Sequence, residues 1–286
     1  MDKQITLSYI TIFTKEHLMT KKIFYAFHIL IIILSVSLVS MEYFSLNSGV
    51  LKSFTKESGF YELGSGFLLF GFGLYLLFQG KDFSSKKIKY ALFIAGIIFM
   101  LGAMEELSWG QHLLGFESTE FASKHNYQHE MNLHNFIPAW FFGLAVNLSF
   151  YVFFIFTPIF IYFYKDKFLN SRFGKYSSLL EYFPSIELVL VFSFAFTLQK
   201  YFIVDTYTDT AALTLAFILL AIIANQKREL LFTLHLIFLV CVTGFFMLAH
   251  GVFSYQNLQY EIREFVLIYT LIFWLYGVVK LLKSRD

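Results

Sequence analysis

The chain has 286 residues, of which 57% are hydrophobic, 21% aromatic and only 15% charged, and its formal net charge is +2. A soluble domain needs more charged surface than this, and a mean hydropathy of +0.63 predicts a helical membrane protein. The small net charge gives no reason to expect a nucleic-acid partner, and the single cysteine, Cys241, excludes an intrachain disulfide and a zinc site built from cysteines.

Apolar segments near the length that crosses a bilayer recur along the chain. We expect eight of them, at about 23–41, 60–79, 89–107, 138–163, 184–204, 210–225, 230–250 and 264–281. The sixth is short. The predicted fold is therefore an all-α polytopic helix bundle, with residues 1–286 forming a single integral membrane domain. Residues 1–20 form a cytoplasmic N-terminal segment, and Met19 offers an alternative start to Met1.

Basic residues decide the predicted orientation of these spans. With eight spans, 17 of the 22 Lys and Arg residues fall on one side of the membrane. The other five are Lys52, Lys56, Lys124, Lys200 and Arg263. Because short loops rich in Lys and Arg stay in the cytoplasm, both termini are expected there. Merging the sixth and seventh apolar segments would place the basic C-terminal residues outside, which disfavours seven spans.

The longest expected non-spanning stretch, residues 108–137, lies on the outer side or re-enters the membrane. It follows two adjacent carboxylates, Glu105 and Glu106, at the end of the third span. Ionisable groups at membrane depth cost roughly 3 kcal/mol or more, so they usually face a protein interior or a water-filled cavity and mark a functional site. If the helix continues one turn further, Glu105 and Ser108 share one face and Glu106 lies on another.

Four histidines lie in this stretch: His112, His125, His129 and His134. The spacing of the last three is like that of metal ligands, with Glu105 or Glu130 completing the set. However, the chain has no H-E-x-x-H motif, and one helix cannot place all three on one face. The alternatives are acid–base chemistry by His134 and a carboxylate, or a buried network in which His134, Asn132 and Asn135 satisfy helix ends. We assign no metal ligand, and the sequence identifies no cofactor.

A third polar group precedes the eighth span. Arg263, the only arginine expected on the outer side, lies between Glu261 and Glu264. A guanidinium there suits a phosphate or carboxylate headgroup, or pairs with a glutamate. Carboxylates near a helix N-terminus are stabilised by the helix dipole, so capping is an alternative role for Glu57, Glu62, Glu261 and Glu264.

Three motifs together resemble a known family. They are Glu57-Ser-Gly-Phe-Tyr-Glu62, Glu105-Glu106-Leu-Ser-Trp-Gly-Gln111 and Glu130-Met-Asn-Leu-His-Asn135. They are similar to E-D-G-x-x-E, E-E-I-S-W-G-Q-R and G-E-x-N-L-H-N in a family of bacterial multi-pass inner-membrane proteins without an assigned activity. This chain departs from the pattern at Ser58, His112 and His129. The resemblance implies a location in the bacterial cytoplasmic membrane and directs attention to the motif residues.

A looser similarity is to glutamate-dependent membrane proteases of the CAAX-processing type. Their E-E-x-x-x-R and F-x-x-x-H motifs match Glu105-Glu106 and Phe121 to His125 in spacing, but the arginine is absent here.

We expect a membrane-embedded hydrolase or transferase that acts on a lipid or lipid-linked substrate at the outer face, with Glu105, Glu106 and His134 as catalytic groups. The expected binding residues are Ser108, Gln111, Glu130, Asn132, Asn135, Glu261 and Arg263. The competing class is a transporter, or a non-catalytic subunit of an envelope assembly. Membrane lipids are the expected surroundings, and the sequence identifies no protein partner.

The orientation can be tested with single cysteines in a Cys241-free background. Cysteines at Ser123 and Asn257 should react with an impermeant maleimide in intact cells whose outer membrane, if present, has been permeabilised, because both positions are expected outside. A cysteine at Ser85 should not react. Labelling at Ser85 alone would reverse the predicted topology.

Overall fold

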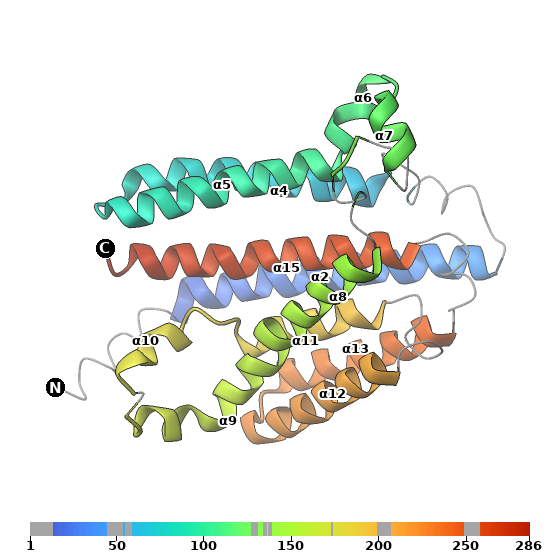
Figure 1. The fold of residues 1–286 in the computed structure, drawn as a ribbon. Helices are drawn as coiled ribbons and strands as arrows, with labels where there is room; N and C mark the ends of the chain where they lie inside the picture. Colours follow the sequence, from blue (N-terminus) through green and yellow to red (C-terminus); the bar gives the residue numbers. More distant parts are fainter. Residues whose placement is uncertain are drawn as a thin grey trace.

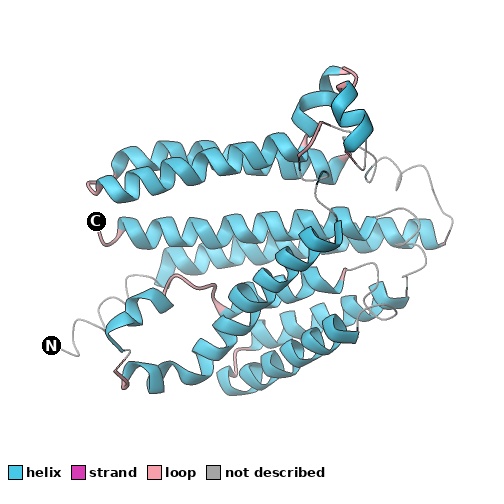
Figure 2. Ribbon diagram, viewed as in Figure 1, coloured by secondary structure: helices cyan, strands magenta, loops and turns pink. Residues whose placement is uncertain are grey.

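The computed structural model describes residues 14–44, 54, 59–126, 131–133, 136, 139–172, 174–198, 207–248 and 258–286. Within these ranges every regular element is a helix (Figure 2), so the all-α prediction is confirmed. Every expected span contains a helix. The long helices are α2 (Thr14–Tyr43), α4 (Phe60–Gln79), α5 (Lys86–Glu106), α8 (Ala139–Ser149), α9 (Thr157–Leu169), α11 (Ile186–Thr197), α12 (Tyr207–Lys227), α13 (Leu230–Leu248) and α15 (Leu258–Lys283).

Four stretches within the described residues are long and apolar enough to cross a membrane. They are Phe60–Asp82, Lys86–Glu106, Leu144–Leu169 and Glu261–Lys283. The other expected spans coincide with shorter apolar helices at Lys22–Leu38, Ile186–Thr197, Ala211–Lys227 and Leu230–Phe246. Composition and these helices together indicate an integral membrane protein. The count of eight crossings and the sidedness of the ends stay predictions.

The fourth expected span is helical throughout but not uniformly α-helical. A π-helical segment, η4 (Phe150–Phe156), joins α8 to α9, and Pro158 occupies the first turn of α9. Proline has no N–H to donate to the carbonyl four residues earlier, which accounts for the altered hydrogen bonding just before it. In Figure 1, α8 runs obliquely across the bundle.

Helices α4 and α5 form a closely packed antiparallel hairpin (Figure 1). A Cβ atom on Gly73 would lie 2.9 Å from the carbonyl oxygen of Gly96, and the converse distance is also 2.9 Å. Small residues allow this approach of two backbones, which is how helices associate in membranes. The hairpin turns through η1 (Gly80–Asp82). It therefore brings the start of α4 and the end of α5 to the same end of the bundle.

Helix α11 occupies the centre of the other half of the bundle. Every residue of α11 except Leu188 is buried, and the helix contacts α9, α12, α13 and α15. A helix that is apolar on all sides is typical of a position enclosed by other helices.

Basic residues gather where α5 begins and α15 ends. Lys283 pairs with Asp82 at 2.9 Å, and the Asp286 carboxylate accepts hydrogen bonds from the backbone N–H and the hydroxyl of Ser84. These donors hold the pKa of Asp286 below its usual value. Elsewhere, Lys227 at the end of α12 donates to Glu187 of α11 at 3.0 Å.

A buried polar group links α2 to α15. His28 is 0% exposed and hydrogen-bonds through Nδ1 to the Tyr269 hydroxyl. The His235 ring of α13 lies 5.4 Å from the His28 ring between centroids. Within the described residues, His28 Nε2 and both ring nitrogens of His235 have no hydrogen-bond partner. The Tyr269 hydroxyl is therefore the group that satisfies His28.

Replacing Tyr269 with Phe should leave His28 Nδ1 buried without its partner. An unsatisfied buried polar group costs about 1–3 kcal/mol, so the free energy of unfolding should fall by that amount. Denaturant unfolding in detergent measures it. Tyr276→Phe is the matched control in the same helix and should have little effect. Equal losses in both variants would contradict the role assigned to the Tyr269 hydroxyl.

Candidate functional site at the carboxylate end of the bundle

Helix α5 ends abruptly just after its two carboxylates. Ser108, Trp109 and Gly110, which form η2 (Ser108–Gly110), all have positive φ, at 45°, 55° and 80°. The helix therefore does not continue the further turn that would place Glu105 and Ser108 on one face. Left-handed conformations are uncommon for residues other than glycine, so this turn is held by its surroundings rather than by local preference.

Glu105 fixes this turn. Its Oε1 accepts a hydrogen bond from Trp109 Nε1 at 2.6 Å, and its Oε2 accepts one from the Leu133 backbone N–H, also at 2.6 Å. Bonds to an ionised carboxylate are among the stronger hydrogen bonds in proteins. One carboxylate oxygen thus holds the turn after α5 through Trp109, and the other joins the end of α5 to Leu133. This arrangement gives Glu105 a positioning role.

Predicted binding residues extend the same network. Gln111, at the start of α6 (Gln111–Leu114), donates to the Ser118 hydroxyl at 2.9 Å and accepts from the Met131 N–H at 3.0 Å. Asn132 is buried and donates to the Ser108 hydroxyl at 3.4 Å. The loop after α5 is thus folded back onto the helix end.

Asn126 belongs to this network although the sequence analysis missed it. It is buried, and its side-chain amide donates to the backbone carbonyl of Asn132 at 2.7 Å and to the side-chain oxygen at 3.0 Å. It follows α7 (Glu120–His125) directly. Only its place just after a short helix could have suggested this role.

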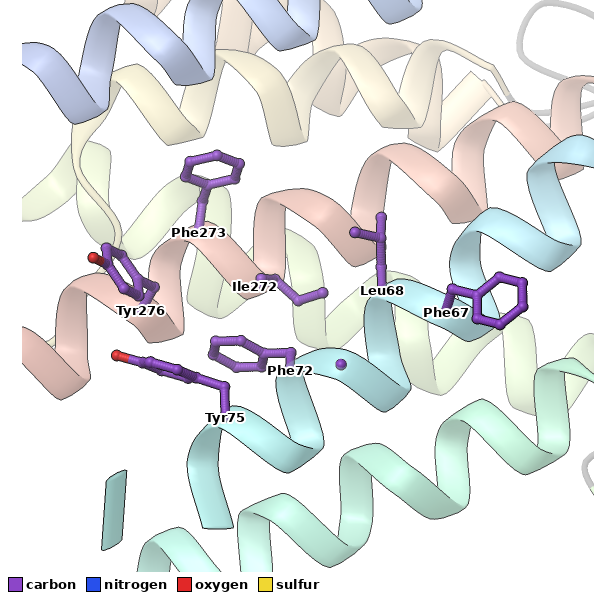
Figure 3. A pocket seen from close by; sticks show the side chains of 8 residues that line it. Phe67, Leu68, Phe72, Tyr75, Ile272, Phe273 and Tyr276 are labelled. Atoms are coloured by element: carbon purple, nitrogen blue, oxygen red, sulfur yellow. The ribbon is translucent and has the colours of Figure 1, made fainter. Parts of the chain in front are cut away.

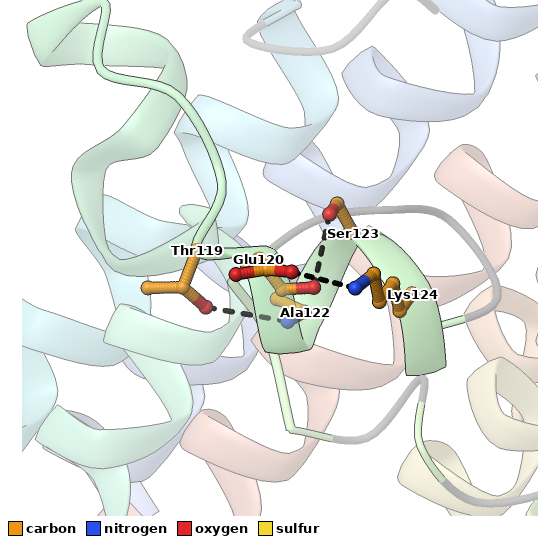
Figure 4. Close-up of polar contacts among 5 residues, drawn as sticks. All are labelled: Thr119, Glu120, Ala122, Ser123 and Lys124. Carbon is orange, nitrogen blue, oxygen red and sulfur yellow. Dashed lines mark hydrogen bonds and ion pairs between the residues drawn. The ribbon is translucent and has the colours of Figure 1, made fainter.

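Helix α7 stands on the outside of this folded loop. Thr119 caps it by accepting a hydrogen bond from the Ala122 N–H, and Lys124 pairs with Glu120 at 2.6 Å (Figure 4). The Phe121 and His125 side chains contact each other on this exposed helix, with ring centroids 4.9 Å apart.

Glu106 lies in a different environment from Glu105. It is close enough to interact electrostatically with Glu62 of α4 and with Glu261 and Glu264 of α15. Within the described residues, no basic side chain forms an ion pair with Glu106. Four carboxylates from three helices therefore gather at one end of the bundle. We call Glu62, Glu106, Glu261 and Glu264 the carboxylate cluster.

Ser65 lies beside this cluster, one turn into α4 from Glu62. Its hydroxyl faces Glu106, beyond ordinary hydrogen-bond distance. The residue is 1% exposed, and within the described residues its oxygen has no hydrogen-bond partner. A buried polar atom without a partner usually marks a site for a water, ion or ligand.

Arg263 contacts α8 and α11. Its guanidinium donates to the Asn147 side-chain oxygen and lies 5.1 Å from the centroid of the Phe196 ring. These contacts connect the start of α15 to the other half of the bundle.

Several predicted site residues lie outside the described residues: Glu130, His134 and Asn135, together with His129 and Glu57. The side chain of His112 is also outside them. Within the described ranges, no group of three or more His, Cys, Asp or Glu side chains has an arrangement that could hold a metal ion. The assignment without a metal stays a prediction.

From the sequence, Glu62 and Glu264 are not predicted site residues and have helix capping as an alternative role, and Ser65 is not singled out. The available signal was their position, because Glu62 opens the second span, Glu264 opens the eighth, and Glu106 closes the third. Because α4 and α15 begin where α5 ends, those three points lie at one end of the bundle.

Comparison with protein-family models, with curated proteins and with solved structures finds no match to this chain. The family resemblance of the three motifs therefore stays a prediction.

Replacing Glu105 with Ala should release the loop after α5. Each lost hydrogen bond to the carboxylate is worth about 1.5–3 kcal/mol, so the free energy of unfolding should fall and amide exchange in residues 108–133 should accelerate. Combining Glu105→Ala with Trp109→Phe should cost less than the sum of the single changes, because both remove one shared bond. The exposed Glu120→Ala is the matched control. Strict additivity of the two changes would show that the Trp109–Glu105 bond contributes nothing.

Proposed function

We propose that this chain is a membrane-embedded hydrolase or transferase acting on a lipid or lipid-linked substrate, with Glu106 as its general acid–base group. In this proposal eight segments cross the bacterial cytoplasmic membrane, both termini are cytoplasmic, and the carboxylate cluster lies at the outer face. Of the three expected catalytic residues, the proposal keeps Glu106 and His134. Glu105 instead takes the positioning role described above.

One observation carries the proposal, namely the position of Glu106 among three other carboxylates. The negative charges of the other three carboxylates disfavour ionisation of Glu106, so Glu106 is stabilised by holding a proton. A carboxyl group that holds a proton can protonate a leaving group and, once ionised, can accept a proton from an attacking hydroxyl or water. These are the steps of hydrolysis and group transfer.

His134 is the proposed partner of Glu106 in proton transfer. It follows Leu133 directly in the sequence, and the Leu133 N–H is bound to Glu105 at the end of α5. Glu105 thus anchors the chain one residue before His134, which supports its assignment to the same end of the bundle.

The alternative is a transporter or a subunit of an envelope assembly in which the same cluster binds a cation. The chain has no internal repeat of the kind common in transporters, and its carboxylate cluster lies at one end of the helices rather than at their middle. These two features favour the enzyme.

Glu106→Gln separates catalysis from scaffolding. It keeps the side-chain shape and removes one of four like charges, so the melting temperature should stay unchanged or rise while function is lost. Glu105→Gln should instead lower the melting temperature, because its two donors lose a charged acceptor. Function is measured as growth or lipid profile of a deletion strain complemented by each variant.

The control for this comparison is Glu120→Gln, which should complement fully. His134→Gln should give the same loss as Glu106→Gln. Full complementation by Glu106→Gln would sink the catalytic role. A fall in its melting temperature as large as that of Glu105→Gln would show that Glu106 is structural.

A further inference from the structure

Three side chains that can carry a proton lie on one face of α2, and each contacts another such side chain from a different helix. Along α2 they are Tyr25, His28 and Ser35, at positions i, i+3 and i+10. Their partners are His235 of α13, Tyr269 of α15 and Tyr61 of α4. None of these six residues is more than 8% exposed. We call them the α2 seam.

Two contacts in the α2 seam are hydrogen bonds. His28 Nδ1 bonds to the Tyr269 hydroxyl, and the Ser35 and Tyr61 hydroxyls lie 3.0 Å apart. Tyr269 is also close enough to Tyr61 for an electrostatic interaction, and the Phe265 ring lies 5.7 Å from each of their rings between centroids. The two hydrogen-bonded pairs are therefore neighbours.

His235 lies between Tyr25 and His28. The centroid of its ring is 4.8 Å from that of Tyr25 and 5.4 Å from that of His28. Both ring nitrogens of His235, and Nε2 of His28, have no hydrogen-bond partner within the described residues. Such buried polar atoms usually mark a site for water or a ligand. Because nitrogens lie on the rim of an imidazole, rotation of two rings this close, or one water between them, joins them by a hydrogen bond.

The α2 seam extends along the bundle. Tyr25 and Ser35 are ten residues apart, which is about 15 Å along a helix and about half of the roughly 30 Å hydrocarbon core of a bilayer. Tyr25 interacts electrostatically with Glu187, at the start of α11, and with Glu229, which is exposed between α12 and α13. Tyr61 is the second residue of α4. The seam therefore leads from the end of the bundle near Glu229 toward the end at which α4 begins.

The chemistry of these side chains suits a proton better than a metal ion. An imidazole has an acceptor and a donor nitrogen on one ring, so it can bind a proton at one and release a proton from the other, and a hydroxyl likewise both accepts and donates. Ionisable side chains inside a membrane bundle are the usual elements of proton relays. A structural or catalytic metal takes at least three protein ligands, and no His, Cys, Asp or Glu within the described ranges joins the two histidines as a third.

We propose that the α2 seam is a proton path through the helix bundle. A proton from the Tyr25 side binds one ring nitrogen of His235, and a proton leaves the other nitrogen for His28 Nε2. His28 Nδ1 then passes its proton to the Tyr269 hydroxyl as that hydroxyl gives up its own toward Tyr61. Single water molecules complete the steps that no direct hydrogen bond spans.

Each step of this path breaks one N–H or O–H bond as the next one forms. The electrochemical gradient drives the transfer, so no oxidant or reductant takes part. The path is independent of the chemistry proposed for Glu106.

Proton flux into liposomes measures the path. The purified full chain is reconstituted with a pH-sensitive dye inside, and valinomycin with a potassium gradient drives protons inward. Flux should exceed that of protein-free liposomes by about ten-fold or more, and His235→Leu should remove most of this excess. The melting temperature of His235→Leu should stay unchanged or rise, because the change removes two buried nitrogens that have no hydrogen-bond partner within the described residues.

The matched control in α13 is Thr243→Val. This buried hydroxyl bonds to the Leu239 carbonyl of its own helix and is not part of the α2 seam. Thr243→Val should leave the flux unchanged.

Two pairs of tyrosines separate the path from general packing. Tyr61→Phe and Tyr269→Phe each remove a hydroxyl of the α2 seam and should lower the flux in folded protein. Tyr75 of α4 and Tyr276 of α15 come from the same two helices, but their rings line an open apolar groove, 5.7 Å apart between centroids (Figure 3). Tyr75→Phe and Tyr276→Phe should therefore leave the flux unchanged.

Flux no greater than that of protein-free liposomes would overturn the path. Unaltered flux in folded His235→Leu, or equal losses in the seam and groove tyrosine variants, would do the same. Because flux is measured without a substrate, the two proposals fail separately. Loss of flux in His235→Leu together with full complementation by Glu106→Gln would overturn the catalytic role alone.

Discussion

The contact between Gly73 of α4 and Gly96 of α5 is the constraint on which the arrangement of the polar groups depends. A side chain at either position would collide with a backbone carbonyl 2.9 Å away, so only glycine permits the two helices to lie this close. Helices in a lipid environment associate through such close packing rather than through a hydrophobic driving force. Because the hairpin is tight and antiparallel, Glu62 at the start of α4 and Glu106 at the end of α5 are brought together. Helix α15 then adds Glu261 and Glu264.

Glu105 and Glu106 take different roles although they are adjacent in the last turn of α5. Successive side chains on a helix diverge in direction, so Glu105 meets the loop while Glu106 meets α4 and α15. The left-handed turn at Ser108 and Trp109 costs about 1–3 kcal/mol for each residue. The two hydrogen bonds accepted by Glu105 contribute about 1.5–3 kcal/mol each. The free energy of these two hydrogen bonds therefore offsets the strain of the turn, and removing the Glu105 carboxylate leaves that strain without compensation.

The two ends of the helices α4, α5 and α15 differ in their charged groups. At the end where α5 begins and α15 stops, Lys283 pairs with Asp82, and the Asp286 carboxylate accepts from Ser84. The opposite end concentrates carboxylates around Glu106 without a basic ion-pair partner for it in the described residues. A proton on Glu106 relieves the repulsion that it meets there, and this is the basis of the catalytic proposal.

The helical class and the positions of the apolar helices followed from the sequence by itself, because the length and polarity of an apolar segment are local properties of the chain. The same pattern placed Glu62, Glu106, Glu261 and Glu264 at span ends on one predicted face. It could not separate the role of Glu105 from that of Glu106, since that depends on the residue at which α5 stops and on which backbone N–H groups reach the helix end. Nor could it find the buried Ser65 hydroxyl beside Glu106. Those features exist only between helices, so the packing of α4 against α5 and α15 decided them.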